Sequence, residues 1–473
     1  CAARILFLWA NLAPSITNDS SRCPAHFAMS PNPFGIRGYL IDAPAYGSLR
    51  SHRNGALIIE NGKIAEVGTY DDLRKRQRPA PVQWIDRGTA AIFPGLIDCH
   101  THLPQYSAVA RGESQLLPWL RENIFPVERE FTGPKARQEA PLFFHELARN
   151  GTTTAMVYAA IYEDSCEVGF EAAEKSGLRV ILGKMMMDLG SYGQLQPKKI
   201  LSVSLIESER LCRKWHGAAE GRLEYAFSPR FAVTCSEKLM RSAGELAQRF
   251  GAYIQTHLAE NREEIEKVHN LHMTARDYTD VYEKCGLLTP KTMLGHCLHL
   301  SAREIDAIAA AQSNVAHCPT SNLFLGSGLL KLDELLNAGL AIGLGSDVAA
   351  GPELNMWQVM RSALAVQKAR NMAEPHLPRM RPNESFHLAT NGGARALGKS
   401  ATIGSLEAGK EADLLVVDLV SLLPYGKNGP GLDDLSTEDI LALCIYRGGP
   451  HATLETYVRG NCVYRAPGCP DPA

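Results

Sequence analysis

The sequence predicts an α/β fold, in which a (β/α)8, TIM-like barrel is joined to a small β-sandwich domain assembled from both chain ends. Over residues 94–397, short apolar strands alternate with helical stretches, which is the pattern of a parallel sheet with crossover helices. Residues 36–93 and 398–465 carry short strands separated by turns, so we expect these two flanks to form the sandwich together. A doubly wound open sheet is the structural alternative for the middle region.

Residues 1–35 are expected to form a poorly ordered N-terminal extension. Within it, residues 11–33 are rich in Pro, Ser and Asn. A segment of that composition buries little apolar surface, so it gains little from packing against the rest of the chain. We therefore place the first strand after this extension.

Both flanks show hairpin patterns. In the N-terminal flank, the apolar run at 56–59 is followed by a Glu-Asn-Gly-Lys turn at 60–63 and a second apolar run at 64–68. Asn-Gly between two such runs is a strong hairpin signal. In the C-terminal flank, strands are predicted at 412–418 and, around a Gly-Asn turn, at 453–464.

The middle region supplies the eight strands that a (β/α)8 barrel requires. The candidates are Ala91–Ile97, Thr152–Val157, Arg179–Gly183, Leu223–Phe227, Ala252–Thr256, Thr292–Gly295, Asn314–Ala316 and Ala341–Gly345. We find no internal repeat that would indicate a solenoid or a propeller.

Composition and charge narrow the classes of function. The chain has 473 residues, 45% hydrophobic and 21% charged, which is ordinary for a globular protein. With 49 Lys and Arg against 51 Asp and Glu, the net charge is −2, so we expect no nucleic-acid partner. No apolar run reaches the ~18 residues of a membrane helix, so we expect no membrane contact. The 12 cysteines are scattered singly, which predicts reduced thiols in a cytoplasmic protein.

His100 and His102 follow the apolar strand at residues 92–98. Residues two apart on a strand point to the same face, so both imidazoles can converge on one ion. Neutral imidazole nitrogen suits zinc. With 15 histidines in the chain, one such pair can also arise by chance, so the pair by itself does not predict a metal site.

Three further side chains occupy equivalent places. His257, His296 and Asp347 each come at the end of a predicted barrel strand. In a (β/α)8 barrel, these ends meet at the rim where active sites are built. A core histidine bonded to a carbonyl explains any one of these positions, but it does not explain the same placement at four strand ends. The pattern therefore predicts a metal site, and a catalytic metal must keep one position open for water.

Glu260 lies three residues after His257, just beyond a predicted strand end. A carboxyl group there can move protons near the metal without binding it. The alternative is a solvated glutamate, because residues 260–264 form a charged run. The fourth strand, at 223–231, has no lysine to bridge two ions, so one metal ion is expected.

These residues resemble a known family. The stretch FPGLIDCHTH at 93–102 is similar to the motif that opens the amidohydrolase superfamily, PG-[FL]-[IV]-D-x-H-x-H. Later motifs of the superfamily are matched in order by HLAE at 257–260, GH at 295–296 and GSD at 345–347. The resemblance covers about residues 36–465.

The resemblance implies a zinc-dependent enzyme with one Zn2+ ion per chain. It implies four zinc ligands: His100, His102, His257 and Asp347. His296 would bind or orient the activated oxygen, and Glu260 would be the proton shuttle. The implied catalytic side chains are therefore Glu260, Asp347 and His296.

Within the superfamily, the sequence is most similar to the guanine deaminases. HLPQYS at 102–107 resembles their H-x-x-Q-Y-S, SPRF at 228–231 their T-P-R-F, and AHCPTSNL at 316–323 their A-H-C-P-N-S-N-L. The sequence departs at Thr320, where these enzymes have asparagine, and at 349–353, which replace a glycine-rich loop.

The resemblance implies five substrate contacts: Gln105, Arg230, Phe231, His257 and Glu260. An amide and a guanidinium can bond the carbonyl and ring nitrogens of guanine, and an aromatic ring packs on a planar base. His317, at the end of the seventh predicted strand, is interpreted as structural, because three better-placed histidines are already present.

The implied reaction is hydrolytic deamination of guanine to xanthine and ammonia. One alternative is a related deaminase or chlorohydrolase that acts on a modified guanine, an adenosine derivative or a triazine. An alternative of another class is a catalytically inactive scaffold, but such a chain would have lost ligands and here none is missing. We expect a small-molecule purine substrate and a homodimer.

Overall fold

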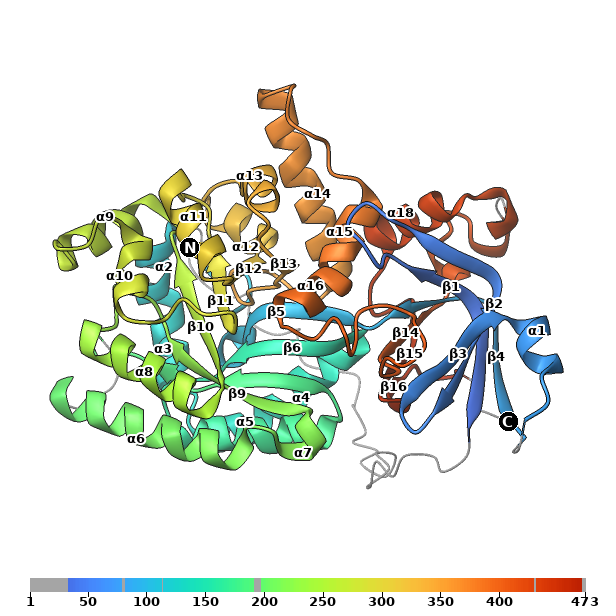
Figure 1. The fold of residues 1–473 in the computed structure, drawn as a ribbon, viewed down its shortest axis with the longest axis horizontal. Coiled ribbons are helices and arrows are strands. Elements are labelled where there is room, and N and C mark those ends of the chain that lie inside the picture. The colour runs from blue at the N-terminus through green and yellow to red at the C-terminus, as the bar shows by residue number, and fades with distance from the viewer. Residues whose placement is uncertain (1–32, 79–80, 113, 191–196, 429–430, 470–473) are drawn as a thin grey trace, which may run out of the picture.

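The computed structural model describes residues 33–469, except for 79–80, 113, 191–196 and 429–430. Within these residues, the strands form a mixed sheet of seven strands and a parallel barrel of eight. Figure 1 shows the two side by side, with the barrel mainly in green and yellow and the mixed sheet in blue and red. The predicted extension, 1–35, falls outside the described residues up to residue 32, and the first strand already begins at Phe34.

The mixed sheet contains strands from both ends of the chain, as the sequence predicts. In chain order, its strands are β1 (Phe34–Asp42), β2 (Arg50–Glu60), β3 (Lys63–Thr69), β4 (Gln83–Pro94), β14 (Leu414–Val417), β15 (Thr453–Val458) and β16 (Asn461–Arg465). The spatial order is β16-β15-β14-β4-β1-β2-β3. The two ends meet where β14 pairs antiparallel with β4, with Leu414 opposite Pro94.

The barrel strands are parallel and follow one another around the barrel in chain order. They are β5 (Leu96–His102), β6 (Thr152–Tyr158), β7 (Arg179–Gly183), β9 (Leu223–Pro229), β10 (Tyr253–Leu258), β11 (Thr292–His296), β12 (Asn314–His317) and β13 (Ile342–Leu344). A short strand, β8 (Met185–Met186), pairs with β9. The barrel closes beyond β13, where the backbone N–H of Asp347 donates to the carbonyl oxygen of His100 at 2.8 Å.

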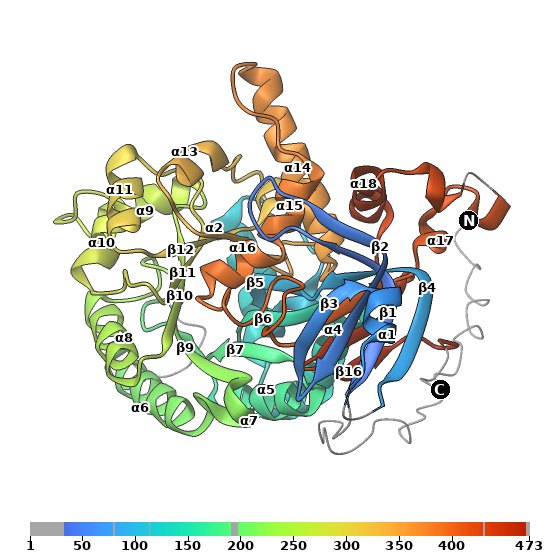
Figure 2. The same cartoon turned by 45° about the vertical axis from the view of Figure 1, so that its right-hand side comes forward.

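Helices follow the strands and surround the barrel (Figure 2). The segment between β5 and β6 contains η1 (Leu103–Ala108), α2 (Leu116–Trp119), η2 (Leu120–Ile124), α3 (Phe125–Glu130) and α4 (Gly133–Arg149). The next barrel helices are α5 (Glu163–Ser176), α6 (Pro197–Trp215), α7 (Ala218–Gly221), α8 (Glu237–Phe250), α9 (Arg262–Leu271), α10 (Tyr278–Lys284) and α11 (Ala302–Ala310). They are followed by α12 (Pro319–Phe324), α13 (Leu332–Asn337), α14 (Met356–Ala373), α15 (Pro382–Leu388) and α16 (Asn391–Ala396).

Helices also lie between the strands of the mixed sheet, and the sequence analysis predicted none of them. They are α1 (Tyr70–Lys75), α17 (Leu419–Leu422), η3 (Gly426–Asn428), η4 (Leu432–Asp434) and α18 (Thr437–Arg447). Helix α18 begins with a capping box, in which Ser436 and Asp439 bond each other's backbone N–H groups. Capping of this kind satisfies donors that a helix N-terminus otherwise leaves free.

Among the apolar clusters of the molecule, one fills the barrel and another packs on the mixed sheet. Inside the barrel, buried side chains from successive strands meet: Ile97, Met156, Ile181, Ala226, Met293 and Ala316. A second cluster packs on the mixed sheet and joins its N-terminal and C-terminal strands through Ile36, Leu57, Ile92, Leu414 and Val416. Since these side chains alternate along their strands, the period of two in the sequence sets which face is buried.

The first predicted barrel strand, 91–97, is wrong in its limits. The structure divides this apolar run into the end of β4 and the start of β5, which belong to different sheets. The change of sheet occurs at Gly95, where a Cβ atom would lie 2.1 Å from the Thr153 hydroxyl oxygen. A continuous apolar run does not reveal such a change of sheet, so the sequence predicts a strand that ends before the pair His100 and His102. It lies within β5.

Among the described residues, no helix is long and apolar enough to cross a membrane. The cysteines that the structure describes between Cys99 and Cys462 are free thiols. The sequence prediction of unpaired thiols therefore agrees with the structure over this part of the chain.

Candidate active site

Five side chains of the metal-ligand type converge at the carboxyl end of the barrel strands. His100 and His102 lie on β5, His257 on β10 and His296 at the end of β11, while Asp347 follows β13. Ligand atoms of all of these except His102 lie within 4.8 Å of one another. The Nε2 atom of His102 lies 3.2 Å from Asp347 Oδ1 and 3.3 Å from His257 Nε2. The barrel thus brings together every metal-ligand candidate that the spacing singled out.

Hydrogen bonds at the outer ring nitrogens orient two of the histidines. His257 Nδ1 lies 2.7 Å from the backbone carbonyl oxygen of Arg230. A carbonyl oxygen only accepts, so Nδ1 carries the proton and Nε2 keeps a free lone pair. His296 is held in the same way, with Nδ1 2.9 Å from the side-chain oxygen of Asn322. His257 therefore directs an unprotonated Nε2 toward the cluster, and His296 turns its Nε2 the same way.

The cluster leaves buried nitrogens without a hydrogen-bond partner within the described part of the chain. These are both ring nitrogens of His100, Nδ1 of His102 and Nε2 of His296. Buried polar atoms without partners are costly and uncommon. A cation among imidazole nitrogens and one carboxylate would satisfy several of them, and a mixed set of nitrogen and oxygen ligands is one that zinc accepts.

Two glycines make room for His100. A Cβ atom on Gly295 would lie 2.7 Å from His100 Cε1, and one on Gly345 would lie 2.7 Å from His100 Cβ. Real Cβ atoms do not approach other atoms so closely, so each glycine lets a neighbouring strand pack directly against the ring. The short motifs GH and GSD thus have a steric cause.

Asp347 is held in a restricted backbone conformation with φ of 47°. Its neighbour Ser346 donates its hydroxyl to Asp98 Oδ2 at 2.6 Å and its backbone N–H to Asp98 Oδ1 at 3.0 Å. Non-glycine residues at such φ values persist only where the surroundings fix them. Asp98 supplies part of that fixation from β5, the strand that also carries the histidine pair.

Burial and neighbouring charge set the protonation of the ligands. Burial lowers the pKa of His102 to about 4 and holds the pKa of His257 well below its usual range, so both rings are neutral at pH 7. Burial opposes ionisation of Asp347, but contacts with the His100 and His102 rings and the charges of His100 and His296 hold its pKa well below its ordinary value. The neutral imidazoles of His102 and His257 therefore lie beside the ionised carboxylate of Asp347.

Glu260 is buried beside the cluster, with only 2% of its surface exposed. Its Oε2 lies 3.3 Å from His296 Nε2, and its Oε1 accepts a hydrogen bond from the Ser327 hydroxyl at 2.9 Å. Burial, with a contribution from the charge of Asp347, raises the pKa of Glu260 to about 8. The alternative of a solvated glutamate is thus wrong, and a carboxyl group that titrates near neutral pH can both give and take protons.

The same cavity contains the side chains expected to contact the substrate. It is lined by His102, Gln105, Leu116, Trp119, Leu120, Arg230, Phe231, His257, Glu260, His296 and Asp347. Its wall combines polar and charged groups with the apolar or aromatic side chains of Leu116, Trp119, Leu120 and Phe231. Small-molecule sites have this composition, with few polar groups that fix orientation.

Similarity to known proteins agrees with this geometry. Residues 91–461 match the amidohydrolase family. The chain belongs to that family. The guanine deaminase of Escherichia coli K12 is 35% identical over 426 residues, which is 88% of this chain and 92% of the relative.

Solved amidohydrolase structures superpose on most of the chain. E. coli guanine deaminase matches with a TM-score of 0.84 and 35% identity, over 91% of this chain and 99% of that chain. A guanine deaminase from C. acetobutylicum with guanine in its active site matches with a TM-score of 0.84 and 29% identity, over 92% of this chain and 100% of that chain. A zinc-bound adenosine deaminase from Xanthomonas campestris matches with a TM-score of 0.77 and 25% identity, over 91% of this chain and 93% of that chain. The predicted barrel fold is confirmed.

Sequence reasoning missed a fully buried residue of this amidohydrolase, Glu128 on α3. Its carboxylate bonds both Gln105 and Arg230. In the sequence it belongs to a charged run, Val-Glu-Arg-Glu, that resembles a solvated helix face. The available signal was its place on the apolar stripe formed by Ile124, Val127 and Phe131, at helical spacing.

Asn322 and Ser327 were also missed, because each acts through a single hydrogen bond to a catalytic candidate. By contrast, His317 was singled out as structural. It is fully buried on β12, and within the described residues neither of its ring nitrogens has a hydrogen-bond partner. Burial lowers its pKa to about 3, so the ring is neutral. Its structural role stays a prediction.

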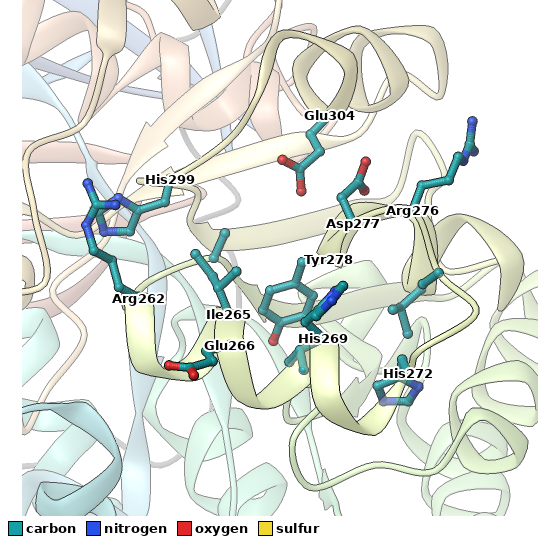
Figure 3. Close-up of a pocket in the computed structure, with 14 residues that line it drawn as sticks. Arg262, Ile265, Glu266, His269, His272, Arg276, Asp277, Tyr278, His299 and Glu304 are labelled. Atoms are coloured by element: carbon teal, nitrogen blue, oxygen red, sulfur yellow. The ribbon is translucent and has the colours of Figure 1, made fainter.

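A second, larger cavity lies among helices α9, α10 and α11 (Figure 3). His299 stands in its wall and contacts the backbone carbonyl oxygen of Ser327 through Nε2 at 2.8 Å. Glu304 uses both carboxylate oxygens within the protein, to Thr279 and Ser301. The wall of this cavity therefore supports the residue that bonds Glu260, and its acidic group is already engaged.

Proposed function

We propose that this protein is a guanine deaminase, which converts guanine and water to xanthine and ammonia with one zinc ion per chain. The observation that carries the proposal is a single buried cavity that holds the metal-ligand cluster, Glu260 and the Gln105 and Arg230 side chains. The similarity to guanine deaminases over most of the chain supports it.

The proposed zinc ligands are His100, His102, His257 and Asp347. His102 is preferred to His296 as a ligand because its Nε2 lies within 3.3 Å of ligand atoms of both Asp347 and His257. His296 Nε2 instead lies 3.3 Å from Glu260 Oε2, on the side of the proposed proton shuttle. When bound, zinc supplies a Lewis acid that makes water nucleophilic near neutral pH.

The chain's own side chains bind the ring and move protons. Arg230 donates to acceptors on the far edge of guanine, Gln105 bonds the same edge, and Phe231 packs against the ring face. Glu260 delivers a proton to the ring nitrogen beside the amino-bearing carbon and then assists the departing ammonia. Asp347 accepts a proton from the attacking water. Because the cavity is buried, these bonds form away from competing solvent.

A substrate panel tests the proposal. The purified protein is assayed for ammonia release with guanine, 8-oxoguanine, adenine, cytosine and a triazine, and its zinc is measured in parallel. We expect kcat/KM for guanine to exceed that for adenine by several orders of magnitude, since a site built to bond polar ring edges rejects analogues that lack them. A preference for adenine or a triazine would overturn the guanine assignment and favour a related deaminase or chlorohydrolase.

Protein without bound metal and without turnover of any panel compound would instead favour the inactive scaffold. The homodimer expected from the sequence stays a prediction, which light scattering of the purified protein tests directly.

A further inference from the structure

Glu128 is fully buried, and both of its carboxylate oxygens are bonded to proposed substrate-binding residues. Oε1 accepts from Gln105 Nε2 at 2.8 Å, and Oε2 accepts from Arg230 Nη1 at 2.6 Å. Gln105 and Arg230 are themselves 3% and 2% exposed. One carboxylate therefore holds two donor nitrogens side by side in the wall of the substrate cavity.

This arrangement allows only one orientation of the Gln105 amide. An ionised carboxylate only accepts hydrogen bonds, so the amide must turn its nitrogen toward Glu128. On the other side, the backbone N–H of Ala349 donates to Gln105 Oε1 at 3.2 Å, which requires an oxygen there. Glu128 requires a donor and the N–H of Ala349 requires an acceptor, so both partners select the same orientation of the Gln105 amide.

Arg230 is fixed by the same group. Its guanidinium, which only donates, is bonded to Glu128 and lies with its carbon 5.0 Å from the ring centre of Phe125. The buried cation thus has a counter-charge and an aromatic face. What Gln105 and Arg230 present to the cavity is set by Glu128, although Glu128 is not among the residues that line it.

We propose that Glu128 is a positioning residue that determines specificity. This role rests on the proposed function. By fixing the Gln105 amide and the Arg230 guanidinium, Glu128 makes the cavity select a purine with an oxo group over one with an amino group at the same position. The Glu128 carboxylate only accepts hydrogen bonds and orients both side chains. The hydrogen-bond donors and acceptors that Gln105 and Arg230 present to the substrate are therefore fixed.

Glu128→Gln changes polarity while it preserves size. Its single carbonyl oxygen can serve Arg230, but its amide nitrogen then faces the Gln105 nitrogen, donor against donor. If Gln105 turns over to relieve this conflict, its nitrogen meets the N–H of Ala349. Both orientations leave one mismatch, so neither is favoured as strongly as the native one. Glu128→Asp, by contrast, keeps an acceptor-only group on a shorter side chain.

The test compares guanine with 2,6-diaminopurine, which keeps the amino group at the reacting carbon but carries an amino group in place of the oxo group. The measured quantity is kcat/KM for guanine divided by kcat/KM for 2,6-diaminopurine. Where 2,6-diaminopurine only inhibits, it is Ki for 2,6-diaminopurine divided by KM for guanine. We expect wild type to favour guanine by about 10⁴-fold and Glu128→Gln to lower that ratio by at least about tenfold. Glu128→Asp should lose activity on both compounds and keep most of the ratio.

Glu455→Gln is the matched control. Glu455 is also fully buried and pairs with an arginine, Arg87, at 2.7 Å, but it lies on β15 in the mixed sheet. The Glu455→Gln substitution should lower thermal stability and leave the preference for guanine over 2,6-diaminopurine unchanged. Zinc content should stay constant in all the variants.

The possible outcomes separate the two proposals. If wild type favours guanine and Glu128→Gln keeps the full ratio, the role of Glu128 is wrong and the proposed function stands. An equal loss of ratio in Glu128→Gln and Glu455→Gln also overturns the role, because it would reflect general destabilisation. If wild type does not turn over guanine, the proposed function itself fails.

Discussion

The Nδ1 atom of His257 lies 2.7 Å from the backbone carbonyl oxygen of Arg230. This contact joins a proposed metal ligand on β10 to a proposed substrate-binding residue at the end of β9. The side chain of Arg230 points into the substrate cavity while its backbone orients a ligand. The proposed substrate site and the proposed metal site therefore meet at the end of one strand.

His257→Ala should remove both zinc and turnover. The substitution deletes a proposed ligand and leaves a ligand set that binds zinc weakly, so we expect zinc to fall from about one ion per chain to a small fraction of that. Metal analysis of the purified variant gives the result. His269→Ala, at an exposed position on α9, is the control and should keep both. Two tightly bound ions in wild type, or full activity after chelation, would contradict the mononuclear site.

Glu260→Gln should separate proton transfer from metal binding. Glutamine keeps the size and polarity of the side chain but cannot carry a proton, so kcat should fall by about 100-fold or more while zinc stays bound. Steady-state kinetics and metal content are measured on the same preparation. Glu263→Gln, an exposed neighbour on α9, should behave as wild type. Loss of zinc from Glu260→Gln would mean that this residue is a ligand.

Gly295→Ala should damage the metal site through sterics alone. The added methyl group would lie 2.7 Å from His100 Cε1 and would push the ring away from the cluster. We expect zinc affinity to fall by about tenfold or more, as measured by competition with a chelator. Gly68→Ala on β3 is the control, because its methyl group would make only ordinary contacts of 3.5 Å or more with Leu73. Unchanged affinity in Gly295→Ala would show that His100 is not a ligand.

Arg230→Ala should lower kcat/KM for guanine by about 100-fold or more, because it removes the donor and leaves Glu128 as a buried unpaired charge. Zinc content should not change, since the backbone carbonyl of residue 230 still orients His257. Arg121→Ala, an exposed arginine in the same segment, is the control. A variant that retains near-normal guanine turnover would exclude Arg230 from substrate binding.

Much of the fold could be predicted because the barrel strands are short, apolar and separated by helices. Seven of the eight predicted strands lie within a residue or two of the observed limits. The first could not be placed, because β4 and β5 form one apolar run that changes sheet at Gly95. The change depends on contacts with Thr153 and Asp413, which are distant in sequence.

The metal cluster could be predicted for a similar reason, since strand ends of a barrel meet at one rim. The residues that hold the proposed site residues through hydrogen bonds could not be predicted. Glu128 is separated from Arg230 by 102 positions, and Ser327 from Glu260 by 67. Each acts through one or two hydrogen bonds whose partners the chain brings together only after folding. A polar residue on an apolar helix stripe was the one local sign, and it applied to Glu128 alone.

The pairing of β14 with β4 has a consequence for biosynthesis. β4 leaves the ribosome with β1, β2 and β3, but the strand that covers its outer edge is made only after every strand of the barrel. During that interval, the nascent chain exposes an unpaired β edge, which is a template for association with other chains. The barrel can assemble during translation, whereas the mixed sheet is completed last, when its C-terminal strands pair with a strand made much earlier. Aggregation of newly made chains should therefore begin at β4.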